Sequence, residues 1–170
     1  MGGSLWKFSL ALYAAPGVAG RCLELQDGCD ADVNLLLCAA WIGASGRGRL
    51  DGRRLAALDD AVQPLRDNVV RPLRAARIWL RAPAAASAEL ATLRTEIKRL
   101  ELAAEQSEQA KLERLADGER SVVDPALRLA DAVSNVALYL ARLGSPDVSI
   151  GNALERALRA AVQSDLTQDL

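Results

Sequence analysis

Residues 33–44, VNLLLCAAWIGA, constrain the fold more than any other stretch of this chain, because a helix over them is apolar on nearly every side. Such a helix is stable in water only when other helices surround it. The apolar residues of the chain are mainly alanine and leucine, and aromatic residues make up 4% of it, which favours helix over strand. We therefore predict an all-α fold: a helical bundle of about six helices around residues 33–44.

The helices of the N-terminal third are marked by their termini. Apolar spacing predicts a first helix over residues 4–14, and Pro16 suits the first turn of the second helix. Asp30 or Asp32 should cap the central helix, and Gly46 and Gly48 should end it. This part of the chain therefore predicts three helices.

The C-terminal third is marked in the same way. Asp124 is the expected cap, and Pro125 the first-turn residue, of a helix that Gly144 and Pro146 close. Apolar spacing that begins at Ile150 predicts the final helix.

The segment 62–81, VQPLRDNVVRPLRAARIWLR, combines two prolines with helical apolar spacing. The stripe keeps its phase across Pro64 and Pro72, so we expect the prolines to bend this helix rather than end it. Its apolar positions are Leu58, Val62, Leu65, Val69, Leu73, Ala76 and Leu80. Four arginines form one stripe largely off the core side, within an arc of about 120°: Arg71, Arg74, Arg77 and Arg81.

Charge is spread unevenly, although the formal net charge is −1. Residues 47–81 contain nine arginines and four aspartates, whereas residues 89–124 contain nine acidic and six basic residues. The arginine stripe has two interpretations. Guanidinium groups suit phosphate and carboxylate, so the stripe is a candidate site for an anionic ligand or partner. Alternatively, it pairs with aspartates of its own helix and with the acidic segment, as charge runs usually do.

The charge-free segment 82–87, APAAAS, is the clearest internal boundary. It separates an N-terminal helical bundle, residues 1–81, from C-terminal helices, residues 88–170, which we expect to pack on the first half as one structural domain. The apolar spacing that follows residue 88 slips near Ser107, so the run of clean heptads that a coiled coil needs is missing.

Residue types that the chain lacks exclude several kinds of chemistry. It contains no histidine, which removes histidine-dependent triads and histidine zinc sites. Its three cysteines show no CxxC spacing, so we expect no disulfide framework and no metal site. No Walker loop and no G-x-G-x-x-G motif is present, and we expect no cofactor. The N-terminal apolar run is short and broken, and no run is long enough to span a bilayer. We therefore expect a cytoplasmic protein without a membrane partner.

Candidate binding residues lie at the start of the central helix and on the arginine stripe. Asn34 lies one turn into an apolar helix, where its amide must find polar partners such as an arginine or a backbone carbonyl. We assign no catalytic residue and no metal ligand. The residues that we single out as a ligand- or partner-binding site are Asp32, Asn34, Arg71, Arg74 and Arg77.

Five separate blocks together cover nearly the whole chain: LWKFSLALYAAPGVAGRCLELQD, DVNLLLCAAWIGASGRG, VVRPLRAARIWLR, EIKRLELAAEQSEQAKLE and SNVALYLARLG. These blocks resemble a proteobacterial family of small conserved hypothetical proteins that is catalogued as a domain of unknown function. The resemblance implies an all-helical bacterial cytoplasmic protein and carries no assigned activity.

Our first expectation is a non-enzymatic interaction or regulatory protein, whose basic stripe and acidic helix bind another protein or a second copy of the chain. The alternative is a site for an anionic small molecule, ligand or substrate, at Asp32, Asn34, Arg71 and Arg74. Association with RNA or the ribosome is the weakest option, because the overall charge is unlike that of a dedicated nucleic-acid binder. A cavity walled by arginines and lined with tryptophan or tyrosine would favour the ligand. Surface arginines that are already paired with carboxylates would favour the protein-interaction function.

Overall fold

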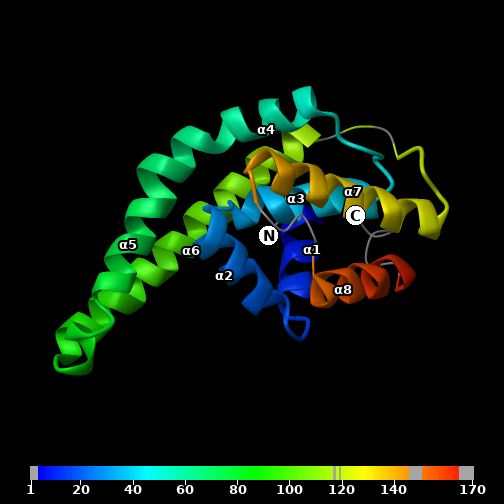
Figure 1. Ribbon diagram of the computed structural model, residues 1–170. Coiled ribbons are helices and arrows are strands. Elements are labelled where there is room, and N and C mark those ends of the chain that lie inside the picture. The colour runs from blue at the N-terminus through cyan, green and yellow to red at the C-terminus, as the bar shows by residue number, and fades with distance from the viewer. Residues whose placement is uncertain (1–3, 117, 119, 146–150, 165–170) are drawn as a thin grey trace.

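The computed structural model describes residues 4–116, 118, 120–145 and 151–164 of the 170-residue chain. Every regular element in these residues is helical, as the composition predicts (Figure 1). None of the described helices combines the length and apolar character that crossing a bilayer requires. The α-helices are α1 (Ser4–Tyr13), α2 (Val18–Cys29), α3 (Val33–Ala44), α4 (Gly52–Leu65), α5 (Arg71–Trp79), α6 (Ala88–Ala116), α7 (Pro125–Arg142) and α8 (Asn152–Gln163).

The central helix that the sequence predicts is α3. Every residue from Asn34 to Ala44 is buried, and α1, α6, α7 and α8 pack against this helix. The approach of α7 is very close: a Cβ atom at Gly43 would lie 2.1 Å from the backbone nitrogen of Ala132, so only glycine fits. Buried apolar residues from every described α-helix except α5 form one cluster, so both halves of the chain contribute to a single core.

Several helix termini agree with the sequence. Asp32 caps α3, because its Oδ1 accepts hydrogen bonds from the N–H groups of Asn34 and Leu35 at 2.8 and 3.3 Å. Asp124 caps α7 in the same way. Asp30, the other expected cap, instead ends α2 in a left-handed conformation with φ of 54°.

The prediction that Pro16 lies in the first turn of α2 is wrong. This helix begins at Val18, after Gly17 in a left-handed conformation with φ of 83°. Proline followed by left-handed glycine is the pair that a tight turn favours, so Pro16 ends the connection from α1 instead. Gly144 follows α7 as predicted, with φ of 66°. The predictions for Pro146 and Ile150 lie outside the described residues.

The arginine-rich segment forms one bent helix, as predicted: α4, a π-helical turn and α5 run without interruption over residues 52–79. The π-turn, Arg66–Val70, lies between Pro64 and Pro72. A proline ring in an α-helix clashes with the carbonyl group four residues earlier. Here the N–H of Arg71 donates to the carbonyl of Arg66, five residues back, which widens the helix just before Pro72.

The π-turn makes one part of the prediction wrong. We expected the apolar stripe to keep its phase with Val69 inward, but Val69 is 37% exposed and Val70 only 2%. A π-turn holds one residue more than an α-turn, so the stripe moves by one position.

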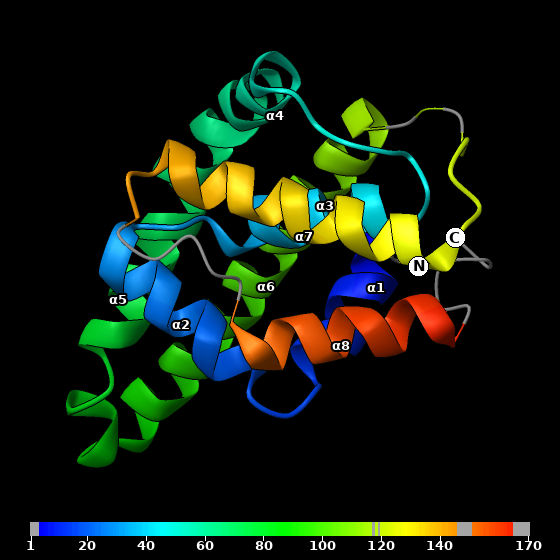
Figure 2. The same cartoon turned by 45° about the vertical axis from the view of Figure 1, so that its right-hand side comes forward.

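The helix α5 and the first half of α6 form a hairpin that extends away from the rest of the molecule (Figure 1). Its turn is the segment 82–87 that the sequence marks as a boundary, and it contains a 3₁₀ turn, Pro83–Ala85. The second half of α6 packs against α1, α3 and α4. Turning the molecule shows α7 crossing α3, with α8 packed against α7, α1 and α2 (Figure 2).

Candidate ligand-binding cleft

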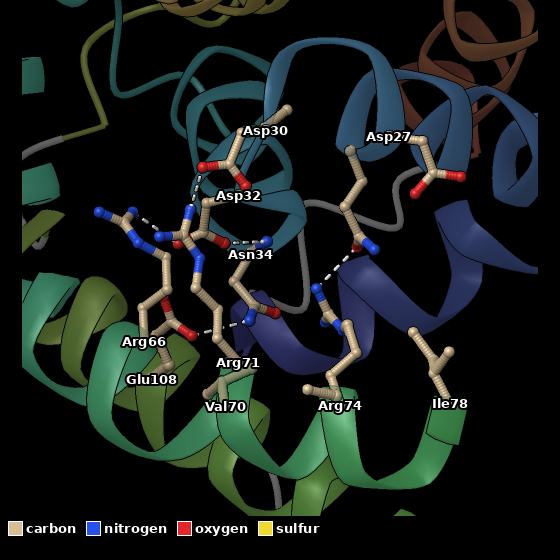
Figure 3. Close-up of a pocket in the computed structure, with 13 residues that line it drawn as sticks. Asp27, Asp30, Asp32, Asn34, Arg66, Val70, Arg71, Arg74, Ile78 and Glu108 are labelled. Atoms are coloured by element: carbon tan, nitrogen blue, oxygen red, sulfur yellow. Dashed lines mark hydrogen bonds and ion pairs between the residues drawn. The ribbon is translucent and has the colours of Figure 1, made fainter. Parts of the chain in front are cut away.

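Two cavities lie between α2, the start of α3 and the hairpin. The first, which we call the acidic cavity, has a volume of about 280 Å³, and its charged lining residues are Asp27, Asp30, Asp32, Glu108, Arg66, Arg71 and Arg74 (Figure 3). The second, which we call the apolar cavity, has a volume of about 510 Å³ and also reaches α1. The two cavities adjoin, because they share the lining residues Gln26, Asp27, Asn34, Arg74 and Ile78.

In the acidic cavity, Asp32 joins the start of α3 to the π-turn. Its Oδ2 accepts a hydrogen bond from Nη1 of Arg66 at 2.9 Å, and its backbone N–H donates to the hydroxyl of Tyr139 at 2.8 Å. The same Arg66 nitrogen donates to Asp59 at 2.8 Å. Burial opposes the charge of Arg66, but the hydrogen bonds to Asp59 and Asp32 outweigh it and raise the pKa of this arginine. Arg66 is therefore a fixed cation between two helices.

Glu108 is the most deeply buried acidic side chain of this cavity, with 0% exposure. Its Oε2 accepts a hydrogen bond from Nδ2 of Asn34 at 2.9 Å, and Oδ1 of Asn34 accepts one from Gln109 at 2.9 Å. The Glu108 carboxyl group also forms a side-chain hydrogen bond with Asp32, which a protonated Glu108 donates. Burial raises the pKa of Glu108 to about 9, and the charge of Asp32 adds to the rise. Glu108 therefore holds a proton at neutral pH.

The arginines of α5 bind carboxylates of α6. Arg74 donates to Glu101 at 3.0 Å, to Glu105 at 2.6 Å and to Gln26 at 2.8 Å, and Arg77 donates to Glu101 through two nitrogens. Burial alone would raise the pKa of Glu101, but the bonds from Arg77 and Arg74 outweigh it and lower that pKa. At Glu105 burial prevails and raises the pKa. The pairing that the charge distribution offers as one interpretation is therefore present.

Arg71 lies nearer the surface and binds Asp67 of its own helix and Asp30 at the end of α2. Each of the three arginines that line the acidic cavity thus pairs with at least two carboxylates. Asp27, in contrast, lines both cavities and forms no ion pair within the part of the chain that the structure describes. All three arginines of the acidic cavity are therefore ion-paired, whereas Asp27 is not, within the described residues.

The apolar cavity has an exposed apolar rim contributed by four helices. Trp6 lines it together with side chains that are 37% to 52% exposed: Leu10, Tyr13, Leu23, Ile78 and Leu102. Apolar side chains that stay exposed around a hollow are typical of binding sites.

Two cations of the apolar cavity differ from the paired arginines. Arg81, just beyond α5, and Lys98, on α6, both line this cavity, and neither has an ion-pair partner among the described residues. They lie on the hairpin, on the side of Arg77 and Glu101 that leads to its turn. The cavity therefore offers positive charge beside an apolar wall.

The structure brings the five singled-out residues to this cleft. Asp32, Asn34, Arg71 and Arg74 line the acidic cavity, and Arg77 lines the apolar one. That they bind a ligand stays a prediction. The partners of Asn34 are Glu108 and Gln109, not the arginine or backbone carbonyl that we expected.

Sequence reasoning missed Arg66, Glu108 and Lys98 as site residues, and it placed Arg81 on the arginine stripe but not among the five singled-out residues. For Glu108 a signal exists: the apolar spacing of α6 slips near Ser107, where the helix buries polar side chains in place of leucine. For Arg66 the π-turn leaves no comparable trace in the spacing.

By fold and site, this is a small all-helical protein with a cleft of ligand size between a helical hairpin and the body that carries it. The chain belongs to the family of proteins of unknown function DUF2390, whose model matches residues 4–112. The match runs from α1 through most of α6, and every residue that lines either cavity falls within it. Neither a curated protein nor a solved structure matches the chain. The family description therefore indicates no activity, and a functional proposal has to be based on the cleft.

Proposed function

We propose that this protein binds a small amphipathic molecule in the apolar cavity, with its anionic group at Arg81 and Lys98. The observation that carries the proposal is the coincidence, in one cavity, of an exposed apolar rim and two cations without an ion-pair partner among the described residues. The volume, about 510 Å³, lies within the range of small-molecule sites, about 300–1,000 Å³. Trp6 and Tyr13 supply the aromatic lining that such sites favour.

The proposal places the anionic group at Arg81 and Lys98 rather than at Arg74 and Arg77. An anion at Arg74 or Arg77 would have to displace Glu101, which is 4% exposed and would be left buried without a partner. No such cost attends Arg81 and Lys98, whose charges are solvated before the ligand arrives. The ligand thus gains attraction without breaking an existing pair.

Calorimetric titration with octanoate and 1-octanol tests the proposal, because the two probes share an apolar chain and differ in charge. Octanoate should bind more tightly than octanol, and the difference should shrink as salt is raised. The double variant Arg81→Gln/Lys98→Gln should lose at least about fivefold in octanoate affinity, with octanol unchanged. Lys7→Gln/Arg53→Gln, which removes two exposed cations outside the cleft, is the matched control. Equal loss in both double variants, or no octanoate binding by the wild type, would contradict the proposal.

A protein partner is a second candidate, favoured by apolar side chains on the projecting hairpin. Trp79 is 72% exposed, and Leu93 and Leu100, seven residues apart on α6, are 47% and 46% exposed. A pair at this spacing lies on one helix face and suits a second helix. Light scattering during gel filtration tests this: a dimer that Leu93→Gln/Leu100→Gln converts to monomer would support the partner, and a monomeric wild type would remove the homodimer.

A further inference from the structure

We infer that the ligand of the apolar cavity carries a hydroxyl group at the end opposite its anionic group, and that Ser9 and Gln109 bind this hydroxyl. The inference rests on the proposed function, because it adds a second recognition point to the same cavity. The observation that carries it is a pair of buried side-chain oxygen atoms, on residues that line the cavity, without a hydrogen-bond partner among the described residues.

Ser9 is the polar exception on a face of α1 that is otherwise apolar or aromatic. The residues of α1 that line the cavity follow the spacing of one helix face: Trp6, Ser9, Leu10 and Tyr13. Ser9 is 3% exposed, and its Oγ meets no partner within the described part of the chain. Buried polar atoms are nearly always hydrogen-bonded, so an unpaired hydroxyl at the wall of a cavity favours a role in binding.

Gln109 supplies a hydrogen-bond acceptor from α6. Its side chain is 2% exposed and lines the same cavity. Its Nε2 donates to Oδ1 of Asn34 at 2.9 Å, and the Nδ2 of Asn34 is itself bound to Glu108. These bonds fix the orientation of the Gln109 amide and leave its Oε1 without a donor in the described residues. Since an amide oxygen only accepts hydrogen bonds, the ligand group that meets it must bring a hydrogen.

The packing of α1 on α6 brings these two oxygen atoms to one end of the cavity. Near the start of α1 and the end of α6, the backbone N–H of Ser4 donates to Glu113 at 2.8 Å. At the end of α1, burial raises the pKa of Tyr13, and the charge of Glu105 adds to the rise. The two helices are therefore antiparallel, and the unpaired serine and glutamine lie level with each other between these two contacts.

A hydroxyl group on the ligand satisfies both oxygen atoms at once. It donates its hydrogen to Oε1 of Gln109 and accepts a hydrogen bond from the hydroxyl of Ser9, whereas a methyl group leaves both atoms unpaired. A carboxylate has no hydrogen to donate, and its charge would be buried. The pair thus selects a neutral group that both donates and accepts, and a hydroxyl is the smallest such group.

The hydroxyl position is well separated from the proposed anion position. The residues of α6 that line the cavity follow one helix face at three- and four-residue steps: Lys98, Glu101, Leu102, Glu105 and Gln109. Lys98 and Gln109 are eleven residues apart, which is about 16 Å along the helix axis. Glu101 and Glu105, which lie between them, are both paired with Arg74. The cavity therefore suits an extended apolar chain with an anion at one end and a hydroxyl at the other.

Calorimetric titration with 10-hydroxydecanoate, decanoate and decanedioate is the direct test. The three probes share a carboxylate and a chain of equal length, and they differ at the other end. The hydroxy acid should bind at least about tenfold more tightly than decanoate, because it makes two further hydrogen bonds. It should exceed decanedioate by at least about tenfold as well, since the second carboxylate would be buried without a donor for Gln109.

Two variants locate the hydroxyl site, with a matched control. Ser9→Ala removes an unpaired hydroxyl and should reduce the preference for the hydroxy acid over decanoate to about threefold or less. Gln109→Met, which keeps the length of the side chain, should do the same. Ser107→Ala, at an exposed serine of α6 outside the cavity whose hydroxyl binds its own helix, should keep the full preference. If Gln109→Met does not fold, Ser9→Ala decides alone.

Three results overturn the inference: equal binding of 10-hydroxydecanoate and decanoate, tighter binding of decanedioate, or a preference that Ser9→Ala or a folded Gln109→Met leaves unchanged. In each of these cases the proposed function stands, provided that Arg81→Gln/Lys98→Gln weakens the binding of decanoate. A wild-type protein that binds neither decanoate nor 10-hydroxydecanoate would contradict both.

Discussion

Arg66 and Asp32 are 34 positions apart in the chain, and their side chains meet at 2.9 Å where α3 begins. Both are largely buried, with side-chain exposures of 13% and 5%. The contact depends on the π-turn, which begins at Arg66 and sets how the bent helix continues past it. This one ion pair therefore ties the bend to the cap of the central helix and builds a wall of the acidic cavity.

Replacing Arg66 should destabilise the fold strongly. Arg66→Ala leaves Asp32 and Asp59 facing each other without the cation between them, and removal of one partner of a buried pair typically costs about 3–5 kcal/mol. Arg99→Ala breaks an exposed pair with Glu96 and should cost less than about 1 kcal/mol. Urea denaturation of both variants measures the difference, and similar losses would mean that the Arg66 pairs are not formed in solution.

The π-turn predicts which of two adjacent valines belongs to the core. Val70→Ala should lower the free energy of unfolding by about 2 kcal/mol, because Val70 is 2% exposed. Val69→Ala should cost no more than about 0.5 kcal/mol, since Val69 is partly exposed. An uninterrupted α-helix would give the reverse order, so thermal or urea unfolding of this pair tests the π-turn itself.

Stability should fall as pH rises through the neutral range because of Glu108. Its pKa rises from 4.5 to about 9 in the folded protein, so between these values the native state holds a proton that the unfolded chain has released. One such group lowers the free energy of unfolding by about 1.4 kcal/mol per pH unit. Glu108→Gln should remove this slope, whereas Glu96→Gln, at an exposed site, should keep it. Parallel profiles for wild type and Glu108→Gln from pH 6 to 8 would contradict the buried proton.

Gly43 should tolerate no side chain, because the α7 backbone at Ala132 occupies the space of its Cβ. Gly43→Ala must push two core helices apart, and overpacking of this kind costs about 1–3 kcal/mol or more. Gly20→Ala, at a helical glycine with open space around it, should be neutral or slightly stabilising. A melting temperature unchanged by Gly43→Ala would show that α3 and α7 are further apart than described.

The sequence predicts the fold well where periodicity and capping act locally. The apolar segment of α3, the cap at Asp32 and the continuous helix across Pro64 and Pro72 all follow from residues within a few turns of each other. The burial of Val70 in place of Val69 cannot be predicted in this way, because apolar spacing alone does not reveal the extra residue that a π-turn inserts before a proline.

The candidate site is predictable only in part, because most of its contacts join residues far apart in the chain. The charge distribution offers pairing of arginines with acidic residues as one of two interpretations, and it cannot say which residues pair. Arg74 pairs with Glu101 and Glu105, while Arg81 has no ion-pair partner among the described residues. Those choices depend on how α5 and α6 align in the hairpin. The unpaired charges on which the proposed binding rests therefore appear only in three dimensions.

Chemical-shift mapping tests most directly that the cleft between α2 and the hairpin is a ligand site. In ¹H–¹⁵N spectra of the wild-type protein, octanoate should shift the amide signals of Leu10, Leu23, Ile78 and Leu102 and leave those of α8, such as Leu158, in place. No shifts at saturating octanoate, or shifts spread over the core helices instead of the cleft, would contradict it.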